Sequence, residues 1–170
     1  VMLDGATWFS RSSLAEIGTF CPLLQVLNLS SCPQVDDACI AAITVGCPSL
    51  SLVNLSCCKG VTSSSLESIL SNTSNLVALS VSGLEQLGEE SSVAWSLLHR
   101  HGTLRFLDVS FCIRLPDAAL VHASLFCPDL EMLDISGCSL LTDNALLSIG
   151  GSCRKLSVLR LRLCAMFTPS

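Results

Sequence analysis

The stretch CPDLEMLDISGCSLLTDNALLSIGGS, residues 127–152, decides the fold, because most of the chain repeats its pattern. Its first leucine recurs at intervals of 26 or 28 residues, at Leu24, Leu50, Leu76, Leu104, Leu130 and Leu156. A fixed period in this range is typical of a solenoid of stacked repeats. The sequence predicts one array over residues 1–170, with partial repeats at 1–20 and 153–170 and whole repeats at 21–46, 47–72, 73–100, 101–126 and 127–152.

Each repeat divides into a strand half and a helical half. In the copy that begins at Cys21, Leu27 and Leu29 are spaced to share one face of a short strand. In residues 127–152, Thr142 stands at a helix N-cap position, and Asp143 follows in the first turn, where the helix dipole favours an acid. Other repeats offer N-cap residues at the same place, namely Asp36 and Thr62.

Parallel pairing of these strands requires each helix to cross over the sheet. Because helices are wider than the strand spacing, the stack must curve, with the strands on the concave side and the helices on the convex side. The predicted fold class is therefore α/β. The chain begins inside a strand and ends before the last helix, so we expect a piece of a longer array that folds poorly alone.

The repeat at 73–100 departs from the pattern. Thr73 and Leu84 replace its two cysteines, and two residues are added before the next repeat. Its second half still predicts a helix with four partly buried residues, Val93, Trp95, Leu97 and Leu98. Two interpretations remain, an insertion tolerated on the outer face or a local binding feature around Gly88, Glu89, Glu90 and Trp95.

Composition excludes several classes of function. Half of the residues are hydrophobic, 14% are charged, and the net charge is -5 with nine Lys and Arg, so the sequence predicts a globular chain that does not bind nucleic acid. Residues 38–58 carry no charge, but they contain Pro48 and Asn54 and cross two repeats, which argues against a membrane span.

No catalytic, metal or cofactor motif is visible. The sequence has no CxxC pair, no nucleophile elbow, no phosphate-binding loop, and only three scattered histidines. We therefore expect no enzymatic activity and no cofactor.

Nine of the eleven cysteines recur at two repeat positions, which predicts columns of small buried thiols. The first position is occupied by Cys21, Cys47, Cys127 and Cys153, and the second by Cys32, Cys58, Cys112, Cys138 and Cys164. Reduced thiols predict a cytoplasmic or nuclear protein. The alternative is an extracellular receptor, which would need disulfides; Asn28, Asn54 and Asn72 lie in glycosylation sequons, but the first two fall in predicted strands.

The pattern CxxLxxLxLxxCxxLTDxxLxxI, from Cys127 to Ile149, resembles the cysteine-containing class of leucine-rich repeat. The resemblance covers nearly the whole chain and is greatest to F-box/leucine-rich-repeat proteins, which are substrate receptors of SCF ubiquitin ligases. It implies a solenoid of about six repeats that binds a protein substrate or partner on its concave face, and that recruits SCF components through an F-box outside this chain. The alternative is a non-catalytic scaffold or adaptor of the same class without an F-box.

Residues that alternate with the core leucines should face the concave side. One column is apolar, and the next two are polar and serine-rich; small polar side chains suit closely paired strands. We predict an apolar anchor at Phe106 and Met132, flanked by Asp108 and Asp134, with arginines at the C-terminal end. The predicted protein-binding residues are Leu52, Phe106, Asp108, Met132, Asp134, Val158, Arg160 and Arg162.

Overall fold

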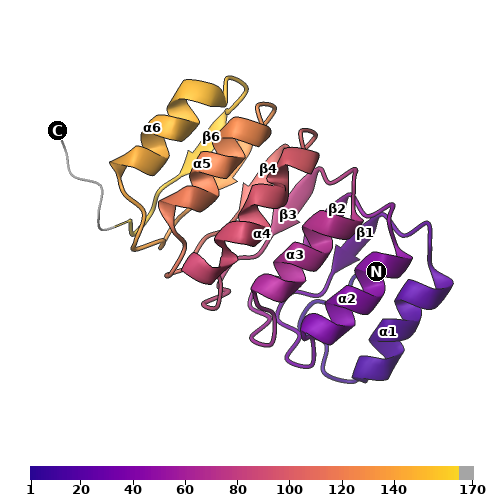
Figure 1. Ribbon diagram of the computed structural model, residues 1–170. Coiled ribbons are helices and arrows are strands. Elements are labelled where there is room, and N and C mark those ends of the chain that lie inside the picture. Colours follow the sequence, from indigo (N-terminus) through magenta and orange to yellow (C-terminus); the bar gives the residue numbers. More distant parts are fainter. Residues whose placement is uncertain (165–170) are drawn as a thin grey trace.

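A computed structural model describes residues 1–164, apart from the side chain of Glu89, so the end of the last predicted repeat, 165–170, lies outside the described residues. One six-stranded sheet has the strand order β1-β2-β3-β4-β5-β6 (Figure 1). The strands are β1 (Val26–Asn28), β2 (Leu52–Asn54), β3 (Ala78–Ser80), β4 (Phe106–Asp108), β5 (Met132–Asp134) and β6 (Val158–Arg160). The helices are α1 (Arg11–Phe20), α2 (Asp37–Gly46), α3 (Ser63–Asn72), η1 (Glu89–Ser91), α4 (Ser92–Ser96), η2 (Leu97–Arg100), α5 (Asp117–Phe126) and α6 (Asp143–Ser152).

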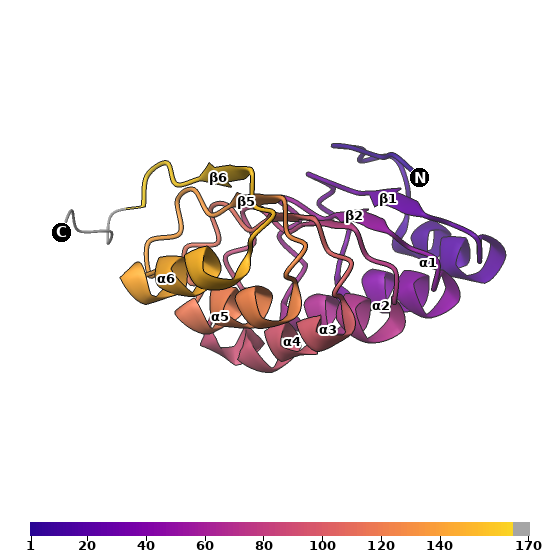
Figure 2. The same ribbon diagram turned by 90° about the horizontal axis from the view of Figure 1, so that it is seen from above.

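All five strand pairs are parallel, and equal positions of successive repeats lie side by side. Val26 pairs with Leu52, and across the longer repeat Ala78 still pairs with Phe106. Figure 2 shows all the helices on one side of the sheet, along the outer side of an arc whose inner side carries the strands. The predicted α/β class with a parallel sheet is confirmed.

The first residues of the chain extend this sheet. The Leu3 N–H donates to the Asn28 carbonyl at 2.8 Å, and the Asn28 N–H donates to the Val1 carbonyl at 2.9 Å. Met2 forms a parallel bridge with Asn28. The chain therefore begins in extended backbone paired with β1, as the repeat alignment predicts.

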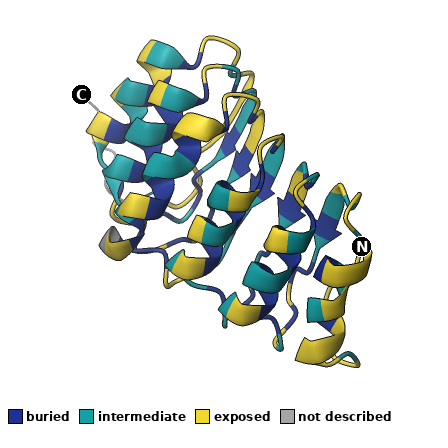
Figure 3. Ribbon diagram, turned by 45° about the vertical axis from the view of Figure 1, so that its right-hand side comes forward, coloured by how far each residue is buried: buried dark blue, intermediate teal, exposed yellow. Residues whose placement is uncertain are grey.

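The core lies between the sheet and the helix layer. Leu27 and Leu29 are buried by the helices, and so are their counterparts in the next repeats, such as Val53 and Leu55. Figure 3 shows that each helix carries both buried and exposed residues, as expected for a helix that covers one face of a sheet. Removal of this apolar surface from water is the main stabilising term.

Three helix starts are capped by the predicted residues, Asp36, Thr62 and Thr142, whereas α4 and α5 begin without a side-chain cap. Thr62 accepts a hydrogen bond from the Ser64 N–H at 3.2 Å, and Asp36 accepts one from the Cys39 N–H at 3.0 Å. The Thr62 N–H and hydroxyl also donate to the carboxylate of Asp37, at 2.9 and 2.7 Å. The acid in the first turn of one helix therefore orients the cap of the next.

Asp117 holds the cap of α6 in the same way, because its carboxylate accepts from the Thr142 N–H at 2.8 Å. Thr142 accepts in turn from the Asn144 N–H at 3.3 Å. This arrangement uses three polar groups per helix start and leaves none of them unpaired, which removes a cost that an uncapped buried terminus would carry.

Two ladders of thiols connect neighbouring repeats. The Cys58 thiol donates to the Leu29 carbonyl at 2.9 Å, and Cys112 and Cys138 make equivalent bonds at 3.1 Å to the repeats before them. All eleven cysteines are free; of the nine in the predicted columns, seven are buried, and Cys21 and Cys164 are half-buried. Burial raises the pKa of Cys58 to about 11 and those of Cys112, Cys127 and Cys138 to about 12.

This burial predicts a large difference in thiol reactivity. At about pH 8, we expect a maleimide to label exposed Cys57 rapidly and the seven buried column cysteines only after unfolding, because an accessible thiolate is the reactive form. Peptide mapping by mass spectrometry identifies the labelled sites. Cys57→Ser should remove the fast phase; rapid labelling of Cys112 or Cys138 in the folded protein would contradict the prediction.

The repeat at 73–100 replaces one long helix by three short segments, η1, α4 and η2. Trp95 and Leu98 are fully buried, with the indole N–H donating to the Ser91 hydroxyl at 3.2 Å. Val93 is 71% exposed, so its predicted partial burial was wrong, whereas Leu97 is half-buried. Trp95 is therefore a core residue, which favours the interpretation of this repeat as an insertion tolerated on the outer face. The alternative, a local binding feature, includes Glu89, whose side chain lies outside the described part.

His101 takes the position that cysteine holds in most repeats, and it is fully buried. Its Nε2 donates to the Leu70 carbonyl at 2.9 Å, so the proton lies on Nε2, while Nδ1 has no partner among the described residues. The His101 carbonyl accepts from the Cys127 thiol at 3.5 Å and continues the thiol ladder. Burial lowers the pKa of His101 below its ordinary value of about 6.5.

This buried imidazole predicts a pH dependence of stability. The folded state holds His101 neutral, whereas the unfolded chain takes up a proton on this side chain as pH falls through about 6.5. The free energy of unfolding should therefore be highest above that pH, as far as His101 contributes to it, and should decrease as the pH falls below it. We expect a smaller decrease between about pH 7 and pH 5 in His101→Thr, which introduces the residue found at position 73. Urea titrations across this range measure it, and parallel profiles would refute the prediction.

Candidate functional site

The sheet face opposite the helices presents the apolar column, which consists of Val26, Leu52, Ala78, Phe106, Met132 and Val158. Leu52 is 39% exposed, Phe106 36% and Val158 40%, and the remaining three are half-buried. Because side chains alternate between the faces of a strand, burying Leu27 and its counterparts against the helices directs the apolar column to the uncovered face. An exposed apolar row of this kind is uncommon unless something binds it.

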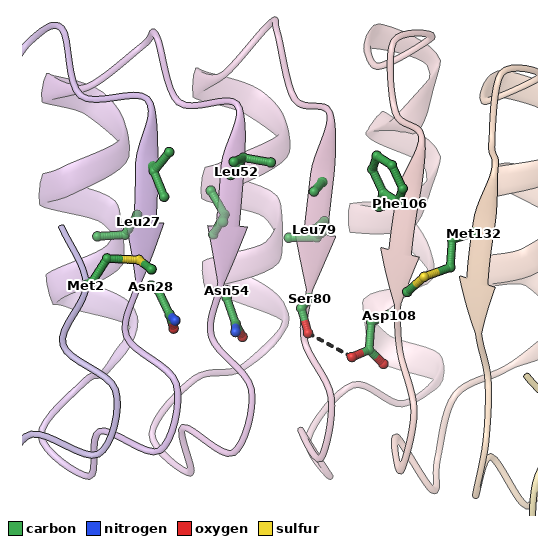
Figure 4. A pocket seen from close by; sticks show the side chains of 13 residues that line it. Met2, Leu27, Asn28, Leu52, Asn54, Leu79, Ser80, Phe106, Asp108 and Met132 are labelled. Atoms are coloured by element: carbon green, nitrogen blue, oxygen red, sulfur yellow. Dashed lines mark hydrogen bonds between the residues drawn. The ribbon is translucent and has the colours of Figure 1, made fainter. Parts of the chain in front are cut away.

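A shallow groove of about 290 Å³ lies along this column from Met2 to Met132. In Figure 4, Met132 reaches from β5 toward β4 and lies near both Phe106 and Asp108, and Leu52 projects from β2 into the same groove. The structure therefore brings the two predicted anchor residues together on adjacent strands.

Polar side chains beside the apolar column stabilise the turns that end the strands. An oxygen of Asn54, Asp108 or Asp134 accepts the N–H of the serine two residues later, at 2.9 to 3.0 Å. Asp108 also accepts the Ser80 hydroxyl at 3.0 Å and the Ser110 hydroxyl at 2.7 Å. These carboxylates are already engaged within the protein.

The serine column is likewise bonded within the sheet. The hydroxyls of Ser82 and Ser110 lie 2.8 Å apart, and Ser30 donates to Asp4 at 2.7 Å. Ser110 and Ser136 are buried, each 6% exposed. These contacts support a structural role for the serines, as small polar side chains between paired strands predict.

The positive charges lie at the C-terminal end of the sheet. Arg160 pairs with Asp134 at 3.4 Å. The backbone N–H of Arg162 donates to the Ser136 hydroxyl at 3.2 Å, and its guanidinium has no ion pair with any described side chain. Asp134, Arg160 and Arg162 together therefore carry one net positive charge.

Sequence reasoning missed a second ion pair beside the anchor. Arg105 donates to Glu131 at 2.7 Å through Nε, and its guanidinium lies 5.8 Å from the centre of the Phe106 ring. The signal was present, because both residues directly precede the apolar column on adjacent strands. The guanidinium of Arg105 therefore lies over the face of the Phe106 ring in a cation–π contact.

A second hollow of about 750 Å³ lies beyond the apolar column at the C-terminal end. Two residues that the sequence did not indicate line it with Arg160 and Arg162: Phe111, 49% exposed, and Leu163, 77% exposed. The eight predicted residues therefore share one face but divide between two hollows. Phe106, Asp108, Met132 and Leu52 line the groove, Asp134, Arg160 and Arg162 line the second hollow, and Val158 lies on β6, next to Met132.

Phe111 occupies a backbone position that favours glycine. The equivalent residue of every repeat has a positive φ, and glycine stands there in three of them, at Gly5, Gly83 and Gly137. At Phe111 φ is 57°, which costs a bulky residue about 1–2 kcal/mol. Its ring packs on Gly137, where an added Cβ would lie 2.6 Å from Cδ1 of Phe111.

Gly137→Ala should therefore destabilise the protein by about 1–3 kcal/mol, through strain at φ +72° and the clash with Phe111. In the background of Phe111→Ser, which places there the residue found at Ser31, we expect a smaller cost because the clash disappears. Urea unfolding of the wild-type protein, Gly137→Ala, Phe111→Ser and the double variant measures the coupling free energy between the two positions. Equal costs in both backgrounds would show that the ring does not pack on Gly137.

No group of three or more His, Cys, Asp or Glu within 1–164 is placed to hold a metal ion. In the same part of the chain, no helix has the length and apolar character needed to cross a membrane.

No family model and no curated protein matches the sequence. The fold is similar to a chain in the crystal structure of the yeast Rad7–Elc1 complex, with a TM-score of 0.71 and 19% identity over 90% of this chain. This chain spans about half of that one, 47% of its length. It is also similar to the tropomodulin C-terminal domain of Caenorhabditis elegans, with a TM-score of 0.66 and 11% identity, covering 86% of this chain and 93% of that one. At these identities the likeness shows a shared fold.

Proposed function

We propose that this chain is a leucine-rich-repeat solenoid that acts as a protein-recognition module and binds its partner on the helix-free face of the sheet. The observation that carries the proposal is the apolar column, which continues in register across six strands and stays accessible at Leu52, Phe106 and Val158. Burying this row against a partner would remove apolar surface from water.

The chemistry of the groove supports recognition of a protein. Phe106 lies under the guanidinium of Arg105 and beside the adaptable side chain of Met132, and exposed aromatic residues are a common source of binding energy. Asp108 and Asp134 have internal hydrogen bonds, so they can form the polar border without being left unpaired.

At a finer level, we propose that the module is the substrate-recognition part of an F-box-type SCF ubiquitin-ligase receptor. The cysteine-containing repeat pattern supports this proposal, and so does the likeness of fold to a chain that crystallised in a complex of two proteins. The ligase would be recruited through an F-box outside this chain. An array without an F-box would instead serve as a scaffold or adaptor.

We propose no catalytic role and a cytoplasmic or nuclear location. A cysteine nucleophile requires a thiolate, and burial raises the pKa of Cys58, Cys112, Cys127 and Cys138 to about 11 or 12. Free thiols across the whole array suit a reducing compartment.

Replacing Phe106 and Met132 together by serine should weaken partner binding by about tenfold or more, because the apolar anchor is lost. The matched control replaces Leu125 and Leu147 by serine, since both are exposed apolar residues of the helix layer. Tagged full-length proteins are crosslinked in cells, and the partners recovered with each variant are quantified by mass spectrometry.

Equal recovery with the Phe106 and Met132 variant and with the wild-type protein would refute binding on this face. The same preparations test the ligase assignment separately. Recovery of a cullin and its adaptor with the full-length protein supports the SCF role, and their absence supports the scaffold. Circular dichroism confirms that each variant is folded.

A further inference from the structure

We propose that the C-terminal hollow, formed by Phe111, Asp134, Ser136, Arg160, Arg162 and Leu163, is a subsite for one carboxylate side chain adjacent to a large apolar residue in the partner. This inference rests on the proposed function and specifies the chemistry of the partner segment. The occupant is a stretch of protein with Asp or Glu next to a residue such as Leu or Phe.

Charge complementarity determines the polar part of the ligand. Asp134 neutralises Arg160, while the guanidinium of Arg162 has no ion pair among the described side chains, so the hollow carries one net positive charge. One carboxylate balances that charge, whereas a doubly charged phosphate would exceed it. A guanidinium also matches the planar geometry of a carboxylate, with two parallel N–H donors.

Exposed apolar surface determines the other part of the ligand. Half of the Phe111 side chain is accessible at the rim of the hollow, which Leu163 also lines. Both residues lie at positive φ, in a conformation that bulky side chains rarely adopt and that Ser31 and Gly83 occupy elsewhere in the array. Large apolar side chains kept in a strained and exposed position suggest a function outside the core.

The hollow is close enough to the apolar groove for a single partner segment to occupy both. Asp134 follows Met132 by two residues on β5, which is about 7 Å along a strand. The volume of about 750 Å³ accommodates side chains of this size. An apolar residue of the segment can therefore contact Met132 while the acid, a few residues away, reaches Arg162.

Selection of random linear peptides by phage display against the immobilised protein tests this subsite. We expect selected peptides to share an acid beside a large apolar residue, and their labelled forms to lose about tenfold or more in affinity with Arg162→Glu and to weaken with Phe111→Ser. Arg154→Glu, the same change in an exposed arginine of the turn between α6 and β6, should have little effect. Exchanging the peptide acid for lysine should restore binding to Arg162→Glu.

Peptides without an acid, equal affinity for wild type and Arg162→Glu, or a library that yields no binder would each overturn the proposal. The outcome is independent of the broader function. If capture of cellular partners still requires Phe106 and Met132 while selected peptides ignore Arg162, the recognition module stands and this subsite fails. Unchanged circular dichroism and urea midpoints show that neither substitution acts through unfolding.

Discussion

The architecture depends on the parallel pairing of equal repeat positions in neighbouring strands. Since Val26 lies beside Leu52, and Leu27 beside Val53, any residue type that recurs in the sequence becomes a column in space. Columns of leucine and valine form the core, columns of cysteine bond to the carbonyls of the preceding repeat, and columns of asparagine and aspartate cap the strand-ending turns. The same backbone pairing therefore aligns the apolar residues of the core, the polar groups that form hydrogen bonds between repeats, and the residues of the exposed face.

The irregular repeat shows how strongly this pairing constrains the chain. Its two added residues leave the register unchanged, with Ala78 still opposite Phe106, so the helix layer accommodates them. The regular helix becomes three short segments, Trp95 is fully buried within them, and His101 replaces a small thiol at the start of the next repeat. The cost of this arrangement includes a buried imidazole nitrogen, Nδ1 of His101, with no partner among the described residues.

The sequence predicted the features that depend on periodicity. The strand positions, the N-caps at Asp36, Thr62 and Thr142, and the burial of most column cysteines follow from residues that recur at fixed offsets. It failed where contacts depend on single residues. Val93 was expected to be partly buried, but the change to short helical turns directs it to solvent. The alternation of side chains along a strand also gave no sign that Phe111 adopts a positive φ and lines a hollow.

This division has a consequence for recognition. Residues that recur along the array hold the coils together, as the 2.8 Å contact between the hydroxyls of Ser82 and Ser110 illustrates. Specificity must then come from positions where the coils differ. Along the exposed face, these are the change from Ala78 to Phe106 in the apolar column, the change from aspartate at 134 to arginine at 160, and the change from glycine at 83 to phenylalanine at 111. All three occur between β3 and β6, so the proposed recognition of a partner assigns its specificity to the C-terminal half of the sheet.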